Sequence, residues 1–529
     1  MVLVSLIQTL IAICTTFLIY KHLIRKSRLP LPPGPRGLPL LGNLLDLPRG
    51  QTPEFKHWLS MKDKYGPIGS VTVLGQHIIL LHGREAVQNI LESQSLKTSG
   101  RPQTEFGSYL CGYGRMMAMH EYDASFRKTR KLFHQQMGTK ATAARYDGSS
   151  EREAGRLLAK ILRNPPELMK HLGSHMATTV LKLTYDYSAR QTAPDPLVEL
   201  LHSVDGSFEA SMIPLAWMVD ILPLLRYLPE GFPFCDFQRT ARLARHQLEK
   251  ATEEPYLFVK QQMSRGNYNP SFVSRNIENV TQRGDLDAED EHDIKWSAFG
   301  MCQAGTDTVL SALRSFIIAM IMFPDVQRKA QDEIARVVGP GRLPTFEDRD
   351  DLPYMQALVK EVHRWGPVVP MSVMHKADGD IEYNGYLIPR GSIIVANSWW
   401  LLHDPEVYPD PSAFDPDRYL EREEPDPTAA AFGFGRRACP GRLIAESAIF
   451  ITAAQILAVF DVGKALDGEG REIEVELEQT AGLLGRPKPF AYRIAARSEK
   501  HAELVRQMEA RYEGDKDDAV VMEGMLSAE

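Results

Sequence analysis

The ten residues from Phe432 to Gly441 have the sequence FGFGRRACPG and place one cysteine, Cys439, in a glycine-rich turn. A cysteine thiolate can ligate iron axially, and the electron density that it donates favours cleavage of the O–O bond. Gly435 and Gly441 allow tight backbone turns close to a flat macrocycle. Backbone N–H groups directed at the sulfur would tune the potential of the iron. The segment therefore indicates a metal-binding thiolate.

Two side chains of the same segment suit that interpretation. Phe432 would cover the sulfur, and Arg437 could pair with an anionic propionate of the macrocycle. The pattern after Gly441 is helical through Val459, so the positive end of a helix would point at the thiolate. The alternative for a lone cysteine is a buried structural thiol, but the whole ten-residue pattern favours a ligand.

The composition of the 529-residue chain excludes several other functions. It holds 61 basic and 68 acidic residues, a net charge of −7, which argues against binding nucleic acid through bulk charge. Its five cysteines are far apart and form no C-x-x-C pair, which argues against a disulfide framework or a cysteine-rich zinc site. The apolar share of 43% is enough for a large core.

The N-terminal residues 2–20 form an uncharged, mainly apolar run. As a helix this run would rise about 28 Å, close to the thickness of the hydrocarbon core of a bilayer. A cleaved signal peptide is the alternative, but such peptides carry their basic residues before the apolar core. Here the basic residues follow it, at Lys21, Arg25, Lys26 and Arg28. This order predicts a single retained membrane anchor, with the rest of the chain in the cytosol.

The rest of the chain predicts one mainly α domain with small β-sheets. Apolar runs of β type occupy residues 68–81, 368–373, 381–387 and 393–396, and helical patterns fill most of the remainder. The apolar run 297–323 contains charged residues at mid-span, so we expect a core helix there rather than a second membrane span. We divide the chain into an anchor with its basic flank (1–28), a stiff Pro-rich hinge (29–50), a catalytic domain (51–495) and a charged tail (496–529). In the tail we expect one weakly amphipathic helix and otherwise solvated chain.

The segment around Cys439 resembles the signature F-x-x-G-x-R-x-C-x-G of the cytochrome P450 haem-thiolate monooxygenases, and every fixed position matches. The resemblance covers about residues 30–495. It implies the P450 fold, haem b (iron protoporphyrin IX) as cofactor and Cys439 as the iron ligand. It also implies that Glu361 and Arg364, in the family's E-x-x-R motif, form a structural triad with Arg418. By itself an i, i+3 pair is usually a solvated surface pair.

A second motif of the family lies in the run 297–323. Residues 304–308 match A-G-x-D-T, which in the family activates dioxygen. The resemblance implies a groove beside Ala304, with Thr308 holding water and oxygen and Asp307 connecting them to solvent, because heterolysis of dioxygen needs two protons. The alternative is a helix bend in which the Thr308 hydroxyl bonds back to a carbonyl of its own helix.

Further cations should bind the haem propionates. Residues 126–130 resemble the family's W-R-x-x-R segment, with Arg130 in the propionate position and Phe126 in place of tryptophan. The phenylalanine keeps the packing and loses one donor, worth about 1 kcal/mol. His375 stands where related fungal enzymes often place a propionate-contacting histidine; a satisfied surface histidine is the alternative.

The chain carries no nucleotide-binding fingerprint, so its electrons should come from another protein. Family resemblance and the anchor together imply NADPH–cytochrome P450 reductase and the endoplasmic reticulum membrane, with the catalytic domain in the cytosol. The acidic reductase would meet a basic face, for which the candidates are Arg127, Lys128, Lys131 and Arg436; solvated surface charge is the alternative for each.

The substrate should be a hydrophobic small molecule. The family folds separate segments over the haem, and here these include the apolar residues Phe106, Tyr109, Leu110, Phe299, Met301, Val369, Met371 and Leu483. Residues 364–370 resemble fungal enzymes of secondary metabolism of the O-methylsterigmatocystin oxidoreductase type. Two functions stay open from the sequence: a monooxygenase that inserts one atom of dioxygen into a natural product, and a haem-binding membrane protein or isomerase without such turnover. The intact A-G-x-D-T favours the first.

Overall fold

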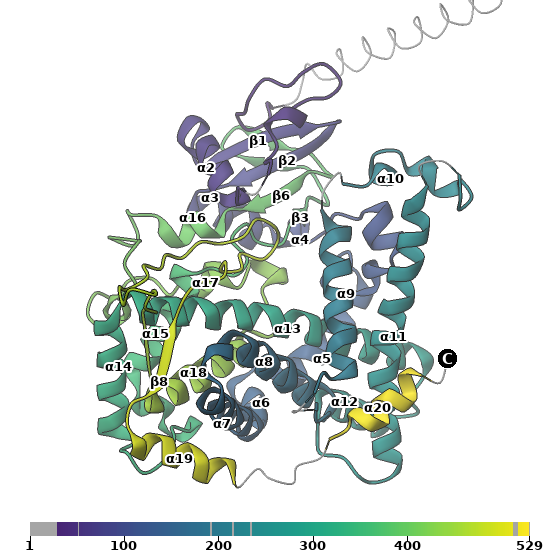
Figure 1. Ribbon diagram of the computed structural model, residues 1–529. Coiled ribbons are helices and arrows are strands. Elements are labelled where there is room, and N and C mark those ends of the chain that lie inside the picture. The colour runs from purple at the N-terminus through teal and green to yellow at the C-terminus, as the bar shows by residue number, and fades with distance from the viewer. Residues whose placement is uncertain are drawn as a thin grey trace, which may run out of the picture.

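The computed structural model describes residues 29–50, 52–190, 193–213, 216–232, 235–510 and 517–527 (Figure 1). The predicted membrane anchor, residues 1–28, lies outside the described residues. Most of the described chain is helical. The helices of eight residues or more are α2 (Glu54–Tyr65), α5 (Ala124–Met137), α7 (Asp147–Arg163), α8 (Leu168–Tyr185), α9 (Pro196–Met212), α11 (Asp236–Ser264), α12 (Phe272–Thr281), α13 (Ala288–Met322), α14 (Pro324–Val337), α15 (Pro353–Trp365), α18 (Arg442–Val459), α19 (Glu499–Glu509) and α20 (Ala519–Leu526).

Helix α13 runs through the middle of the helical body and packs against α8, α5, α11, α12 and α18 (Figure 1). It begins nine residues before the predicted run and ends at Met322. In the described part of the chain, α13 and α18 are long and apolar enough to cross a membrane, but most of each is buried inside the protein. The expectation of a core helix rather than a second span is therefore confirmed.

A small sheet lies apart from the helical body, at the end of the molecule where the described chain begins (Figure 1). Its strand order is β1 (Ile68–Val73), β2 (Gln76–Leu81), β6 (Ile393–Ala396) and β3 (His375–Lys376). Strands β1 and β2 are antiparallel, whereas β2 and β6 are parallel, with Ile79 opposite Ile394. Two two-stranded sheets complete the fold: β4 (Ile381–Tyr383) with β5 (Tyr386–Ile388), and β7 (Phe460–Gly463) with β8 (Arg493–Ala496).

Residues 368–373 do not form the strand that their apolar character predicts. Pro367 and Pro370 lack backbone donors, and Ser372 adopts a left-handed conformation with φ 51°. The segment is a chain of turns whose carbonyls accept from other elements, such as Trp399 N to Pro370 O at 2.9 Å. The pairing strand begins only at His375, which lies opposite Ile394.

The Pro-rich segment is docked onto the sheet and does not form a free spacer. Ser70 donates its backbone N–H to Pro33 O at 2.8 Å and its hydroxyl to Pro32 O at 2.6 Å. The side chain of Asn43 is buried and accepts from the Thr72 backbone at 2.9 Å. The course of the Pro-rich segment is therefore set by sheet contacts as well as by proline stiffness.

The described part of the C-terminal tail forms two helices, α19 and α20, one more than we expected. Met522 and Ala519 of α20 have no exposed surface, because this helix packs against α9 and α11 (Figure 1). Asp518 accepts from the backbone of Ser188 at 2.9 Å, and Arg190 forms an ion pair with Glu523 at 2.7 Å. The end of the tail is therefore packed on the body and is not simply solvated chain.

Candidate functional site

Cys439 lies in the turn between a 3₁₀ helix, Gly435–Arg437, and the start of α18. Its backbone N–H donates to Phe432 O at 2.8 Å. Its side chain is accessible, whereas the other cysteines of the described chain, Cys111, Cys235 and Cys302, are buried. Protein nevertheless surrounds the thiol, and this burial raises its pKa, while a hydrogen bond from the Gly441 backbone and the charge of Arg130 act in the opposite direction. The thiol is shielded and reachable, as an iron ligand must be.

Gly435 and Gly441 are required in the turn for different structural reasons. A Cβ on Gly435 would lie 2.3 Å from the Leu91 carbonyl oxygen, and its backbone has φ 55°. Gly435 also donates its N–H to Glu92 at 2.9 Å. This glycine is therefore required by close packing on the segment Gln88–Ser93, which the sequence did not indicate. Gly441 is the glycine beside the sulfur, since a Cβ there would lie 3.9 Å from Cys439 Sγ.

Phe432 packs edge-on against the ring of His363, with the ring centroids 4.7 Å apart. His363 belongs to α15 and is buried, and that burial lowers its pKa to about 4. The neutral ring therefore serves as a packing partner, and it fixes Phe432 beside the turn that carries Cys439.

Two buried guanidinium groups lie near the same turn. Arg437 donates to Ser99 O at 2.7 Å and to His120 O at 2.5 Å. Arg101 donates to Met374 O at 2.6 Å and to Ala118 O at 3.0 Å. Burial, together with the charge of Arg437, lowers the pKa of Arg101 to about 9. Neither guanidinium forms an ion pair with a carboxylate of the described chain. Two adjacent buried cations of this kind are costly without an anion.

Arg130 and His375 complete a cationic and polar cluster. Arg130 makes no hydrogen bond or ion pair with a described residue; burial lowers its pKa, and the nearby Cys439 opposes that shift. His375 is buried, and its Nδ1 lies 2.7 Å from the Thr98 carbonyl oxygen. Because a carbonyl only accepts, Nδ1 carries the proton. Burial and the charge of Arg101 lower the pKa of His375 to about 3, so its Nε2 is an acceptor unless an anion approaches.

These residues fit a dianionic macrocycle bound by a thiolate. Arg101 and Arg437 are buried next to each other without a carboxylate partner in the described part of the chain, and the charge of Arg130 interacts with the accessible Cys439 thiol. The two propionates of a haem would neutralise such cations. Arg101 was missed by the sequence analysis. No local signal marks it, because its burial requires segments near residues 118 and 374 to meet residue 101.

Helix α13 contributes the A-G-x-D-T residues. Ala304 is exposed, although most residues of α13 are buried. The Thr308 hydroxyl donates to the Ala304 carbonyl at 2.6 Å. This is the hydrogen bond to its own helix that we considered as the alternative to a role in oxygen activation. A Cβ on Gly305 would lie 3.2 Å from Val180, so this glycine admits the close approach of α8. The Asp307 carboxylate forms an ion pair with Arg486 at 2.7 Å. The roles of Thr308 and Asp307 in oxygen activation stay predictions.

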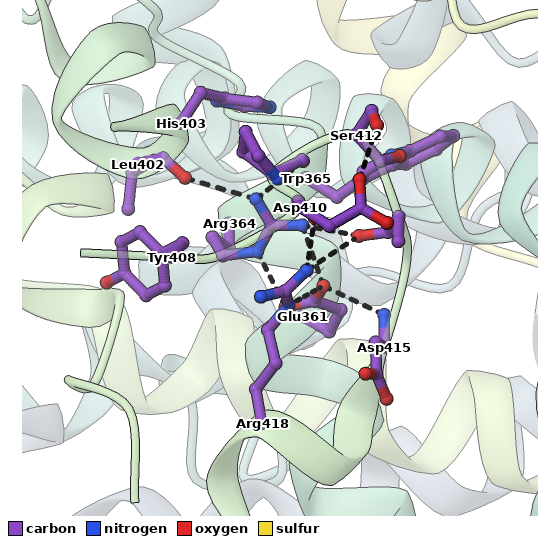
Figure 2. Close-up of polar contacts among 12 residues, drawn as sticks. Glu361, Arg364, Trp365, Leu402, His403, Tyr408, Asp410, Ser412, Asp415 and Arg418 are labelled. Atoms are coloured by element: carbon purple, nitrogen blue, oxygen red, sulfur yellow. Dashed lines mark hydrogen bonds and ion pairs between the residues drawn. The ribbon is translucent and has the colours of Figure 1, made fainter. Parts of the chain in front are cut away.

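The predicted triad is confirmed (Figure 2). Arg364 donates to both carboxylate oxygens of Glu361, at 2.8 and 2.7 Å, and Arg418 donates to the same carboxylate at 3.2 Å. All three side chains are at most 1% exposed. Tyr419 and the Asp415 backbone also donate to Glu361, at 2.8 and 2.9 Å. The triad therefore joins α15 to the segment 402–419.

Some of the residues expected on the basic face and in the substrate pocket do not have the surroundings that we predicted. Lys128 binds Glu289, Asp290 and Asp293 at 3.0–3.1 Å, which neutralises it, whereas Arg127, Lys131 and Arg436 are exposed. Phe106 and Phe299 are fully buried core residues, and Phe106 stacks on Trp217 at 3.6 Å, so neither lines an open pocket.

Comparison with known proteins identifies the family. The profile of the family Cytochrome P450 matches residues 32–493. The chain belongs to the cytochrome P450 family. It is 44% identical to cytochrome P450 monooxygenase CLM2 of Gibberella zeae over 97% of this chain and 98% of that protein. It is 41% identical to the multifunctional cytochrome P450 monooxygenase af510 of Aspergillus fumigatus over 93% of each chain. It is 34% identical to O-methylsterigmatocystin oxidoreductase of Aspergillus flavus, over 94% of this chain and 93% of that protein.

The protein is therefore an enzyme, a haem-dependent cytochrome P450 monooxygenase related to fungal enzymes. These relatives are named monooxygenases, and the chain matches them over almost their whole lengths. This similarity decides against the alternative of a haem-binding protein or isomerase without oxygen insertion. Members of the family hold haem through a cysteine thiolate, and they need reducing equivalents, dioxygen and a small-molecule substrate.

Proposed function

We propose that this P450 binds haem b through Cys439 and inserts one oxygen atom into a hydrophobic natural-product intermediate. The observation that carries the proposal is the accessible Cys439 thiol, whose charge interacts with that of Arg130, a cation without a carboxylate partner among the described residues. The similarity to O-methylsterigmatocystin oxidoreductase, an enzyme named for a natural product, supports the substrate class.

When bound, the haem would supply the oxygen-activating iron. Arg101, Arg130 and Arg437 would bind its propionates, and the buried charges of Arg101 and Arg437 would no longer be uncompensated. His375 would donate to a propionate only as an imidazolium, since its Nδ1 proton is already held by the Thr98 carbonyl. Haem binding should therefore raise the pKa of His375.

Thr308 and Asp307 of α13 would transfer protons during oxygen activation. Thr308 has one hydroxyl proton, which it now donates to Ala304 O. Released from that carbonyl, the hydroxyl could donate its proton into the site and accept another relayed from Asp307. The partly exposed Asp307 carboxylate would connect the site to solvent.

Electrons would come from NADPH–cytochrome P450 reductase. Arg127, Lys131 and Arg436 are exposed basic residues suited to its acidic surface. The apolar run 2–20 and the basic residues after it support a single-pass anchor in the endoplasmic reticulum membrane, with the catalytic domain in the cytosol.

Aerobic turnover with reductase and NADPH tests this function across a panel of fungal terpenoids, aromatic polyketides and indole metabolites. Mass spectrometry with ¹⁸O-labelled dioxygen should find a product heavier by one labelled oxygen atom. Cys439→Ala should lose both that product and the ferrous–CO spectrum of a thiolate-ligated haem, whereas Cys235→Ala, at a buried thiol, should keep both. A full thiolate spectrum in Cys439→Ala would refute the ligand assignment.

A further inference from the structure

The last described helix, α20, lies across two helices that come much earlier in the chain. It packs against α9 and α11, which also pack against each other (Figure 1). The side chains of Ala519 and Met522 are buried, and those of Val521, Met525 and Leu526 are partly buried against the core. The apolar face of α20 is therefore docked on this pair of helices.

The start of α20 is tied to the segment of chain that precedes α9. The backbone N–H of Asp518 donates to Ser188 O at 3.0 Å, and the Asp518 carboxylate accepts from the Ser188 backbone at 2.9 Å. Arg190 donates to the Glu523 carboxylate at 2.7 Å and lies 3.6 Å from that of Asp517. Two reciprocal backbone contacts and an ion pair thus join the tail to residues 188–190.

The same short segment is bonded to the first turn of α9. Asp195 is the N-cap of α9, and one of its carboxylate oxygens accepts from the backbones of Leu197 and Val198 at 3.0 and 3.1 Å. Its other oxygen accepts from the Tyr187 hydroxyl and from the Arg190 backbone, both at 2.9 Å. Asp195 therefore connects the segment that α20 binds to the helix that α20 covers.

The other end of α20 is tied to α11. Lys250 of α11 donates from its ammonium group to the carbonyl of Leu526 at 2.5 Å, and Leu526 is the last residue of α20. The last carbonyls of a helix have no acceptor role within it and carry a partial negative charge, so a cation is favoured there. The helix is thus attached at one end to the chain before α9 and at the other end to α11.

Helices α9 and α11 both lie against α13, which carries the A-G-x-D-T residues. Glu209, in the last turn of α9, and Asp307 of α13 accept from one guanidinium, that of Arg486, at 3.1 and 2.7 Å. Helix α11 packs against α13 and against the short helix Glu105–Leu110, which we expect over the haem. A small molecule that enters from this side must separate α9 or α11 from α13.

We propose that α20 is a strap that holds α9 and α11 over the A-G-x-D-T segment and slows the entry of small molecules to the haem site. Its two attachments and its buried face act together, because a helix of eight residues is unstable by itself in water. Loss of one attachment should let α9 and α11 move away from α13 more often. This inference rests on the proposed haem site, since entry is measured at the iron.

Four variants test the strap in the haem-loaded, full-length enzyme: Arg190→Gln, Arg190→Lys, Met522→Ala and, as the matched control, Glu499→Gln. Glu499 belongs to α19 of the same tail and forms an exposed ion pair with Arg506. The probe is phenylimidazole, whose ring nitrogen ligates ferric haem and shifts its absorption, so stopped-flow absorbance gives both rates. We expect several-fold faster association and dissociation in Arg190→Gln and Met522→Ala, partial return in Arg190→Lys and wild-type rates in Glu499→Gln.

Hydrogen–deuterium exchange of backbone amides is a readout that needs no ligand. Exchange should be faster in α9, α11 and α20 of Arg190→Gln and Met522→Ala, and it should stay unchanged in α15, which reports that the body remains folded. Exchange in α20 equal to the wild type would show that these contacts do not hold the helix. Faster exchange in α20 with wild-type phenylimidazole rates would show that the helix does not control entry. Either result overturns the proposal. If the wild type itself binds no haem, the proposed function fails, which is a different result.

Discussion

Arg364 donates two hydrogen bonds to Glu361, three residues earlier on α15, and neither side chain is exposed to solvent. Removing two charges from water is costly, so a buried pair stabilises only where every donor and acceptor is satisfied. Here Arg364 also donates to the carbonyls of Leu402, Pro411 and Ala413 (Figure 2). The pair therefore holds a long irregular segment against α15.

Glu361→Gln should destabilise the protein by about 3–5 kcal/mol, because the buried Arg364 would lose its carboxylate and Arg418 would keep only its pair with Glu424. The matched control is Arg328→Gln, which breaks the exposed i, i+3 pair with Asp325 and should cost at most about 1 kcal/mol. Urea unfolding measures both, and haem content should fall only in Glu361→Gln. Equal stabilities of the two variants would contradict the structural role of the triad.

Thr308→Ala should separate oxygen consumption from product formation. NADPH oxidation and haem binding should persist, while product per NADPH falls several-fold and hydrogen peroxide release rises, because the hydroxyl no longer donates a proton. Activity driven by added peroxide should fall less. Ser315→Ala is the control, since Ser315 makes the same kind of bond to its own helix at Ser311, 3.1 Å away. If product per NADPH in Thr308→Ala equals that of the wild type, Thr308 does not deliver protons and its hydroxyl only bonds the Ala304 carbonyl.

Acid should destabilise the fold through buried histidines. Burial, aided by Lys160, lowers the pKa of His175 to about 3, and its Nε2 lies 3.1 Å from the Thr452 hydroxyl. Between that value and about 6.5 only the unfolded state binds the proton, so stability falls by about 1.4 kcal/mol per pH unit as pH drops below about 6.5. His175→Gln should remove this contribution in unfolding measured from about pH 7 to about pH 5. His246→Gln, at an exposed site, should keep the wild-type slope; the same slope in His175→Gln would contradict the prediction.

Helix α20 should contribute to stability. Met522→Ala leaves a cavity where the side chain is fully buried, which costs about 2 kcal/mol or more. Val520→Ala, at a site 67% exposed, should be nearly neutral. Chemical unfolding gives the free energies, and limited proteolysis should cut the tail faster only in Met522→Ala. Resistance equal to that of the wild type would mean that the tail does not depend on this contact.

Removal of residues 1–28 should release the protein from membranes and keep the thiolate–haem spectrum, because the core contacts of the Pro-rich segment begin at Pro30. Sedimentation with membranes and the ferrous–CO spectrum test this. Loss of haem in the truncated chain would show that the N-terminus belongs to the fold.

Local patterns were enough to predict several parts of the molecule. The turn around Cys439, the helix after it and the core helix α13 follow from glycine placement, apolar periodicity and short-range motifs. The triad was predicted as well, although only by resemblance, since the E-x-x-R spacing alone describes a surface pair.

Features that depend on the meeting of distant segments could not be predicted in this way. Arg101 is buried by chain that lies up to 273 residues away, and Arg486 reaches Asp307 across 179 residues. The segment 368–373 has the apolar character of a strand, but its prolines and the left-handed Ser372 prevent pairing. Burial and charge pairing are properties of the assembled core, because a side chain's dielectric surroundings are set by all the elements that enclose it. The amino-acid sequence thus determined the family and predicted Cys439 as the iron ligand, and the tertiary structure decided which charges are buried and which have a carboxylate partner.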